Sequence, residues 1–167
     1  MVVDFIEKVS TQELSKFFKD DLSRYKSFID NGDFAPIYNR ISRPQYVTYF
    51  LMNAGIDVLE ELLDHGITKI PNFMFMGLDI KNIDILEGFT TIGESAFTDC
   101  TKLKRITLPH SLKDIEEYAA DGIYEDQKVD IIYNGTVSDW QRVSIWQPPN
   151  YINYNIFKDE HKIIYKI

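Results

Sequence analysis

Apolar residues recur at helical spacing through the first part of the chain. Ser10 and Glu13 fit a capping box, in which each side chain satisfies a backbone N–H of the other residue. Asn31-Gly32 supplies residues that tolerate the left-handed backbone at which helices end. Between these signals lies one apolar face, which consists of Leu14, Phe17, Phe18, Leu22, Tyr25, Phe28 and Ile29. The pattern predicts a helix that begins near residue 10 and ends near residue 31.

Two shorter helices are predicted between residues 42 and 66 by the same signals. Ser42 and Gln45 fit a second capping box, and an apolar stripe follows it. Asp57 stands where the third helix would begin, and the apolar positions of that helix are Val58, Leu59, Leu62 and Leu63. Apolar stripes of this kind face a protein core. We therefore expect residues 1–66 to form a helical segment that packs onto the next part of the chain.

The hydrophobic period changes after residue 66, and the following segments repeat one another. Three short segments end in an isoleucine: Ile67–Ile70, Phe89–Ile92 and Leu112–Ile115. These closing isoleucines (70, 92 and 115) are 22 and 23 residues apart. A second set of segments alternates apolar and polar residues: Ile83-Asp84-Ile85, Ile106-Thr107-Leu108 and Val129-Asp130-Ile131. A period in the low twenties is the length of one solenoid coil.

Stacked coils place equivalent residues in columns, because one coil cannot bury its apolar side alone. The spacing predicts one column of Ile70, Ile92 and Ile115, and a second column of Ile85, Leu108 and Ile131. Parallel stacking also pairs the backbone of each short strand with the coils on both sides. Both ends of the stack would expose apolar surface and strand edges, so both ends need caps.

The central coil resembles a known family. The run TTIGESAFTDCTKLKRITLPHSLKDI, residues 90–115, resembles the BspA-type leucine-rich repeat, which occurs in bacterial surface proteins and also in phage and protist proteins. The matching positions are Ile92-Gly93, Ala96-Phe97, Cys100, Leu103, Ile106, Leu108-Pro109, Ser111-Leu112 and Ile115. The coils on either side lack the Cys, and the later one has Ala120 in place of the usual Phe. Gly135-Thr136 followed by Trp140 resembles the ending that often follows the last such repeat.

These patterns predict an α+β protein in three parts. Residues 1–66 form a helical N-terminal cap, residues 67–136 a leucine-rich-repeat solenoid of about three coils, and residues 137–167 a C-terminal β cap. Residues 163–167 have strand-like composition, with Lys158–His161 as the turn of a hairpin. The C-terminal aromatic residues either cap the last coil or form a self-association surface that makes the protein a homo-oligomer. These residues are Trp140, Trp146, Tyr151, Tyr154, Phe157 and Tyr165.

The charge of the chain narrows the choice of partners. The formal net charge is −8, and the acidic excess is spread along the sequence. Such a chain cannot draw binding energy from counterion release, which disfavours a nucleic-acid partner. No apolar run is long enough to cross a bilayer, and the N-terminus lacks the apolar stretch of a signal peptide. We therefore expect a cytoplasmic protein without a membrane partner.

Few residues suggest reaction chemistry. Cys100 is the only cysteine and has no His or Asp at catalytic spacing, and the resemblance places it inward, where the coil bends. The three histidines, His65, His110 and His161, are scattered and form no pair with metal-ligand spacing. No phosphate-binding loop or dinucleotide fingerprint is present. We expect neither a metal nor a cofactor, and we do not expect an enzyme.

The alternation of the strands predicts a binding surface. Residues between inward-facing apolar positions must point outward. This places Asp84, Thr107 and Asp130 in one exposed column, and Asn82, Arg105 and Lys128 in the next. The resemblance and this mixed-charge surface favour a non-catalytic protein–protein interaction module. The alternative is a small acidic, phage-encoded inhibitor of a host nuclease or defence protein, for which the evidence is the size, the charge and the occurrence of the repeat in phage proteins.

Overall fold

The computed structural model describes residues 45, 48, 49, 52, 57–124, 126–146, 155–158 and 163–166. Gln45, Thr48, Tyr49 and Met52 are helical, at positions within the second predicted helix. The capping-box residues Ser10 and Ser42 lie outside the described residues, and so does the apolar face between residues 14 and 29. The first predicted helix therefore stays a prediction.

Helix α6 spans Val58–Asp64 and begins at the predicted cap. The Asp57 side chain accepts hydrogen bonds from the backbone N–H groups of Leu59 and Glu60, both at 3.1 Å. These bonds satisfy two of the donors that a helix leaves free at its start. Gly66, with a φ of 74°, follows the helix in the left-handed conformation that favours glycine. The prediction of a third helix between Asp57 and Gly66 is confirmed.

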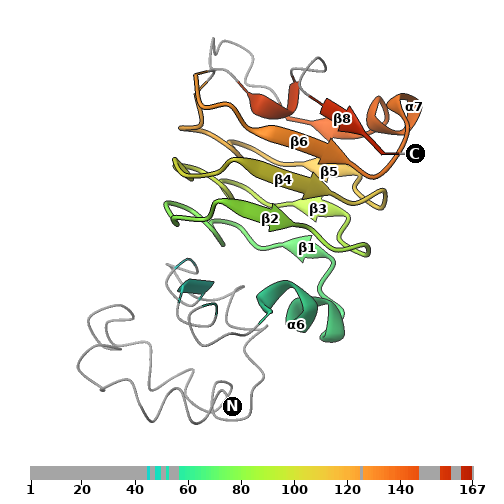
Figure 1. Ribbon diagram of the computed structural model, residues 1–167. Helices are drawn as coiled ribbons and strands as arrows, with labels where there is room; N and C mark the ends of the chain where they lie inside the picture. The colour runs from blue at the N-terminus through green and yellow to red at the C-terminus, as the bar shows by residue number, and fades with distance from the viewer. Residues whose placement is uncertain are drawn as a thin grey trace, which may run out of the picture.

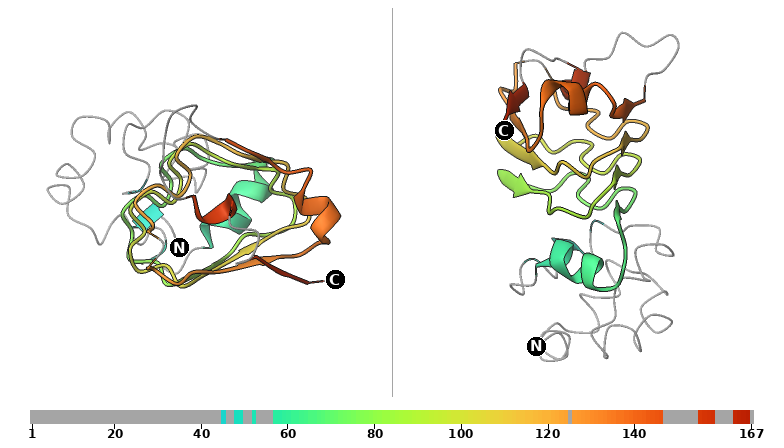
Figure 2. Two further views of the ribbon diagram at one scale, coloured as in Figure 1. Left: turned by 90° about the horizontal axis from the view of Figure 1, so that it is seen from above. Right: turned by 90° about the vertical axis from the view of Figure 1, so that its right-hand side faces the viewer.

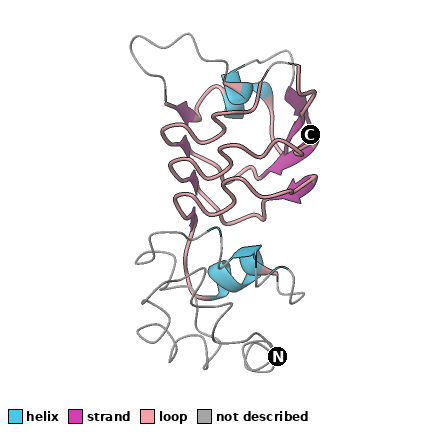
Figure 3. Ribbon diagram, turned by 90° about the vertical axis from the view of Figure 1, so that its left-hand side faces the viewer, coloured by secondary structure: helices cyan, strands magenta, loops and turns pink. Residues whose placement is uncertain are grey.

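Within the described residues, the strands form two parallel four-stranded sheets (Figure 1). The β1 sheet contains β1 (Lys69–Ile70), β3 (Thr91–Ile92), β5 (Asp114–Ile115) and β7 (Ser144–Ile145). The β2 sheet contains β2 (Asn82–Asp84), β4 (Arg105–Leu108), β6 (Asp130–Tyr133) and β8 (Ile163–Tyr165). The chain changes sheet after each strand, so strands of the same sheet stack above one another. Figure 3 shows the two sheets on opposite sides of the stack.

The predicted isoleucine column is present in the β1 sheet. Ile70 pairs with Ile92, and Ile92 pairs with Ile115, in parallel register. All three side chains are fully buried. The column continues to Ile145 of β7. The spacing of 22 and 23 residues in the sequence therefore identified the correct stacking in this sheet.

The predicted second column is wrong in its third member. Ile131 pairs with Ile106 and not with Leu108, whose partner is Tyr133. Ile131 therefore belongs to a different inward column, which consists of Ile83, Ile106, Ile131 and Ile163. The interval from residue 83 to residue 106 is 23 residues, whereas that from 106 to 131 is 25. The two additional residues lie between β5 and β6, and they shift the register of β6 by two positions.

The bends between the sheets repeat one backbone geometry. Phe73, Ser95 and Tyr118 have positive φ angles of 61°, 53° and 53°. The N–H of Phe73 donates to the carbonyl of Glu94, and that of Ser95 donates to the carbonyl of Glu117, each at 2.9 Å. Hydrogen bonds between coils therefore continue through the bends as well as the strands. This pairing satisfies backbone groups that the bends would otherwise leave without partners.

One hydrophobic cluster joins α6, both sheets and the C-terminal residues. The rings of Phe75 and Phe97 stack within it, and Ala120 takes the next aromatic position. The short 3₁₀ helix η2 (Ile156–Lys158) buries Ile156 and Phe157 in the same cluster. In the view along the stack (Figure 2, left), η2 lies inside the outline of the coils. Phe157 thus contributes an aromatic ring to the C-terminal end of the core.

The C-terminal strands extend both sheets and do not form the predicted hairpin. β7 pairs with β5, and β8 pairs with β6, each in parallel. Between β6 and β7 lies α7 (Val137–Trp140), which begins with a capping box of Thr136 and Asp139. Trp140 is buried edge-on against Tyr133, with ring centroids 5.1 Å apart. The Gly-Thr…Trp ending therefore forms a capped turn of helix that packs onto the core.

Candidate binding surface

The outward side of the β2 sheet carries the predicted site residues, in two columns that differ from the predicted ones. The first column consists of Asn82, Arg105 and Asp130. The second consists of Asp84, Thr107, Ile132 and Ile164. Five of the six predicted residues therefore lie together on one face, which we call the exposed β2 face, but Thr107 is buried within it, contrary to the prediction that it is exposed. This face is defined by these two columns.

Lys128 does not join the column of Asn82 and Arg105, contrary to the prediction. Asp130 occupies that place, because the longer connection before β6 shifts its register by two residues. Lys128 precedes β6 and is exposed. Lys128 therefore lies before the start of the strand ladder and not within the face.

Asp84 links the two columns at the β2 end of the face. Its Oδ1 accepts a hydrogen bond from Thr107 Oγ1 at 2.5 Å. Its Oδ2 lies 3.8 Å from Arg105 Nη2, in an ion pair between two partly exposed side chains. Such a pair adds little stability, since solvent screens it. The Arg105 Nε atom is buried and has no hydrogen-bond partner among the described residues. The guanidinium is therefore only partly engaged by the protein itself.

An apolar patch adjoins this polar half, and the sequence prediction missed it. Ile132 is half-buried, and Ile164, its partner in β8, is 50% exposed. The signal was present in the run Val129-Asp130-Ile131-Ile132-Tyr133, where Ile132 breaks the alternation of apolar and polar residues. An isoleucine at an outward position of a strand places apolar surface in water.

Cys100 lies inside the core, as the resemblance implied. Its Sγ donates a hydrogen bond to the backbone carbonyl of Phe75 at 3.1 Å. Burial raises the pKa of the Cys100 thiol to about 12, and the nearby carboxylate of Asp99 acts in the same direction. The thiolate is the nucleophilic form, so the folded protein holds this sulfur in an unreactive state at neutral pH.

A small polar cluster surrounds Asp139 at the start of α7. Thr136 donates to Asp139 Oδ2 from its hydroxyl at 2.6 Å and from its backbone N–H at 3.0 Å. These two bonds lower the pKa of Asp139, and the nearby His110 and Arg142 lower it further. His110 Nε2 lies 3.6 Å from Asp139 Oδ2. Every contact of this carboxylate serves the helix cap or its immediate neighbours.

The described residues contain no group of three or more His, Cys, Asp or Glu side chains placed to hold a metal ion. His161 lies outside the described part of the chain. None of the described helices has the length and apolar character that a bilayer-spanning segment needs.

The C-terminal aromatic residues that the structure describes take part in packing. Trp140 and Phe157 are buried, and Tyr165 contacts Tyr133 edge-on with centroids 6.4 Å apart. Trp146 packs against Tyr118, with centroids 4.7 Å apart. Tyr151 and Tyr154 lie outside the described residues. Self-association through this region stays a prediction.

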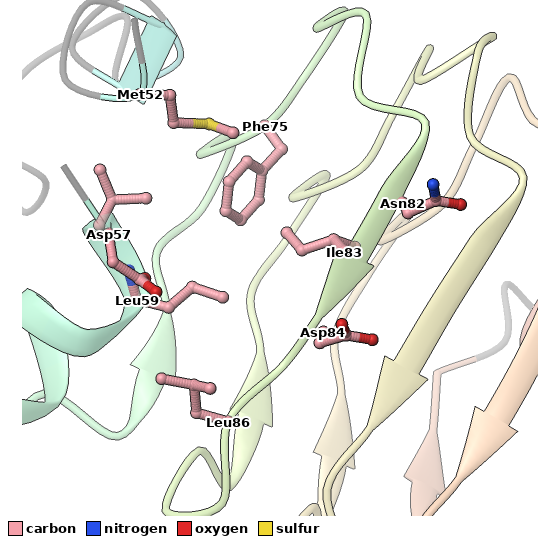
Figure 4. A pocket seen from close by; sticks show the side chains of 9 residues that line it. Met52, Asp57, Leu59, Phe75, Asn82, Ile83, Asp84 and Leu86 are labelled. Atoms are coloured by element: carbon pink, nitrogen blue, oxygen red, sulfur yellow. The ribbon is translucent and has the colours of Figure 1, made fainter. Parts of the chain in front are cut away.

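A groove lies where α6 meets the first coil (Figure 4), and we call it the N-terminal groove. Its volume is about 590 Å³. Apolar side chains from α6, from the neighbouring helical residue Met52 and from the first coil line it, together with three polar residues of its rim. The lining residues are Met52, Asp57, Val58, Leu59, Phe75, Asn82, Ile83, Asp84 and Leu86.

The stacked parallel strands, the inward isoleucine columns and the exposed β2 face define a leucine-rich repeat protein, in which the described residues form mainly strands with few helices. Residues 68–165 match the family model described as "BspA type Leucine rich repeat region (6 copies)". The chain belongs to this family of BspA-type leucine-rich repeat proteins.

Comparison with individual proteins adds one solved structure. The crystal structure of a leucine rich cell surface protein from Faecalibacterium prausnitzii A2-165 is similar to this chain, with 32% sequence identity and a TM-score of 0.38. The match covers 48% of this chain and 21% of that protein, so this chain matches about a fifth of its length. No curated protein sequence matches the chain.

Proposed function

We propose that the protein is a non-catalytic interaction module that binds another folded protein through the exposed β2 face. Membership of the leucine-rich repeat family supports this proposal, since repeat proteins offer extended surfaces for binding. In this proposal the described strands are rungs of a short solenoid, which α6 covers at one end and η2 covers at the other. The burial of Leu62 and Phe157 in one cluster supports that arrangement.

One observation carries the choice of surface: a partly engaged charged group adjoins an exposed apolar patch on a single face. Arg105 and Asp130 occupy neighbouring positions in the first column, and Ile132 and Ile164 occupy neighbouring positions in the second. Interfaces typically combine an apolar centre with polar groups that fix the register of the partner. The exposed β2 face has both parts within adjacent strands.

The outward side of the β1 sheet is a weaker candidate. Its strands have two residues each, so it presents a narrower surface. Lys69 Nζ donates to both carboxylate oxygens of Glu116, at 2.7 and 2.6 Å. Glu116 also accepts a hydrogen bond from the backbone N–H of Glu94. These charges satisfy one another and offer less to a partner.

The test uses two charge-exchanged variants of the full chain. Arg105→Glu/Asp130→Lys reverses the exposed β2 face and leaves the net charge unchanged. Lys113→Glu/Asp114→Lys does the same on the β1 sheet and is the matched control. A partner is first captured from the native source by cross-linking, then purified, and its affinity for each chain is measured by calorimetry. We expect the β2-face variant to bind at least about tenfold more weakly, because like charges would then meet at the interface.

The control variant should bind like the parent, and both variants should keep the melting temperature and the circular dichroism of the parent. Equal binding by a folded Arg105→Glu/Asp130→Lys variant would move the interface away from this face. A third variant, Ile164→Ser, tests the apolar half separately, and its affinity should fall while its fold is retained, since Ile164 is half exposed.

A further inference from the structure

We propose that the partner of the exposed β2 face presents an acidic surface to a row of four lysines beside that face. These lysines come shortly before the strands of the β2 sheet, and we call them the strand-entry lysines: Lys81, Lys102, Lys104 and Lys128. The inference rests on the proposed function, because it names the chemistry of the same partner. The ligand class is an acidic protein segment, whose carboxylates pair with the lysine ammonium groups.

The backbone brings the strand-entry lysines together on successive coils. Lys81 precedes β2 and Lys104 precedes β4, and the N–H of Lys104 donates to the carbonyl of Lys81 at 2.7 Å. Paired strands stand roughly 4.8 Å apart, so these two lysines are direct neighbours. The start of β6 continues the stack, since the N–H of Asp130 donates to the carbonyl of Lys104 at 2.8 Å. Figure 1 shows the starts of β2, β4 and β6 one above another.

Gln127 fixes the segment that carries Lys128. Its Nε2 donates to the backbone carbonyls of Cys100 and Leu103, at 3.0 and 2.9 Å. These two carbonyls come before and after Lys102 in the chain. Lys102 and Lys128 therefore lie on two segments that are in direct contact.

The strand-entry lysines have no ionic partner within the described part of the protein. All four are exposed, and none forms an ion pair with a described residue. Asp79 and Asp126 are exposed in the connections that lead to β2 and β6, but they do not pair with these lysines. Lys69, by contrast, is held by Glu116 at 2.6 Å. Like charges at neighbouring positions of a ladder repel each other, so a carboxylate from outside gains energy by lying between them.

The surroundings of these lysines are positive, although the chain is acidic. Residues 79–82, 101–105 and 126–130 together hold five Lys or Arg against three Asp, a net charge of +2, whereas the whole chain has −8. Arg105, whose Nε has no hydrogen-bond partner among the described residues, follows Lys104 directly. An acidic protein surface is therefore complementary to this region. A nucleic acid is disfavoured, because the acidic remainder of the chain repels its phosphates.

The first experiment uses the full chain labelled with ¹⁵N-lysine, at low salt, and two matched probes. One probe is the peptide acetyl-Glu-Glu-Gly-Glu-Glu-amide, and the other has Gln in place of every Glu. We expect the Glu peptide to shift the amide signals of Lys81, Lys104 and Lys128, and to leave that of Lys113 unchanged. The Gln peptide should bind at least about fivefold more weakly, since it makes no ion pair. Salt at about 1 M should abolish the shifts, because it screens exposed charges.

Lys113 provides the matched control. It is also exposed and forms no ion pair with a described residue, but its backbone bonds lead to Thr90 and Ser144, so no second cation stands beside it. Lys104→Gln and Lys113→Gln each remove one positive charge. We expect Lys104→Gln to bind the Glu peptide about threefold more weakly and Lys113→Gln to bind it like the parent. Both variants should keep the melting temperature of the parent.

The partner captured by cross-linking separates this inference from the proposed function. Lys81→Glu/Lys104→Glu should lower its association rate constant about tenfold at low salt and leave its dissociation nearly unchanged, because charges beside an interface act mainly on association. If this variant associates at the parental rate while Arg105→Glu/Asp130→Lys weakens binding, the inference fails and the proposed function stands. If the lysine variant alone is impaired, the interface lies at the lysines and the proposed function fails.

The peptide results can overturn the inference without any partner. No shift by the Glu peptide up to millimolar concentration would do so, and so would equal binding of the two peptides. A shift at Lys113 as large as those at Lys81 and Lys104 would show unspecific attraction to any lysine. Equal losses for Lys104→Gln and Lys113→Gln would have the same meaning.

Discussion

The phenyl rings of Phe75 and Phe97 stack almost parallel, with centroids 5.1 Å apart and an interplanar angle of 7°. Both side chains are fully buried. Phe97 belongs to the central coil, so the ring has core neighbours on both sides, whereas Phe75 lines the N-terminal groove. Phe97→Ala should therefore lower the free energy of unfolding by about 3–5 kcal/mol. Urea denaturation measures this loss, and Tyr124→Ala, at a position 67% exposed, should change it by less than about 0.5 kcal/mol. Similar losses for both variants would contradict the central placement of Phe97.

The inward residues of β4 should be equally sensitive. Ile106 and Leu108 are fully buried, with paired strands on both sides. Ile106→Ala and Leu108→Ala should each cost about 2–5 kcal/mol, because each leaves a cavity that the neighbouring strands prevent from closing. Thermal melting checks this, with Ile164→Ala as the exposed control. Melting of both core variants within a degree or two of the parent would show that these side chains are not core.

Two glycines distinguish a close backbone contact from backbone strain alone. A Cβ added at Gly93 would stand 2.4 Å from the carbonyl oxygen of Ile70, a backbone atom that is itself bonded to the Gly93 N–H. A Cβ at Gly77 would meet nothing within 4 Å, although its φ of 70° strains an alanine. Gly77→Ala should cost about 1–2 kcal/mol. Gly93→Ala should cost more, since two stacked coils must separate, and equal losses in urea denaturation would refute that explanation.

Cys100 should react only when the protein unfolds. Its pKa of about 12 in the folded protein lies above the ordinary value of 9.0. At pH 8 iodoacetamide should leave the native protein unmodified and should alkylate it fully in urea, as mass spectrometry would show.

The raised pKa of Cys100 also makes the stability of the protein depend on pH. Above about pH 9 the unfolded chain loses this proton while the folded chain keeps it, so this contribution to stability falls as the pH rises towards 12. The stability of Cys100→Ala should lack this pH dependence. Rapid alkylation of the native parent protein would contradict the buried position of Cys100.

The sequence predicted the first three strands of the β1 sheet correctly, but not β7, because the signal of those three strands has one solution. Ile70, Ile92 and Ile115 are separated by nearly constant lengths of chain. A displacement by one residue would point a buried isoleucine towards the solvent. The start of α6 was equally clear, since Asp57 is a cap that precedes a buried apolar face.

The third strand of the β2 sheet was misaligned for a specific physical reason. Val129, Ile131 and Tyr133 are all buried and alternate with outward residues. A shift of two residues therefore preserves the inward and outward pattern, and periodicity cannot distinguish the two registers. The two registers differ in how many residues belong to the connection before β6, and the packing of the folded chain decides that number. The same shift moved Lys128 off the face and brought Ile132 onto it.

The N-terminal groove could not be predicted from the sequence at all. It depends on how α6 lies against Phe75 and Ile83, which come from different segments of the first coil. Each of these residues, taken alone, looks in the sequence like an ordinary residue of the hydrophobic core. The space between them results from the angle at which helix and coil meet, and no local pattern encodes that angle.

The parallel direction of all the strands that the structure describes makes the two ends of the stack unlike each other. One end presents the β1 and β2 edges, and the other presents the β7 and β8 edges. Two copies joined end to end, β8 against β2, would leave the same pair of edges free, so the contact would be heterologous and would propagate into a filament without closing. What covers these two ends therefore decides between a discrete particle and an open polymer.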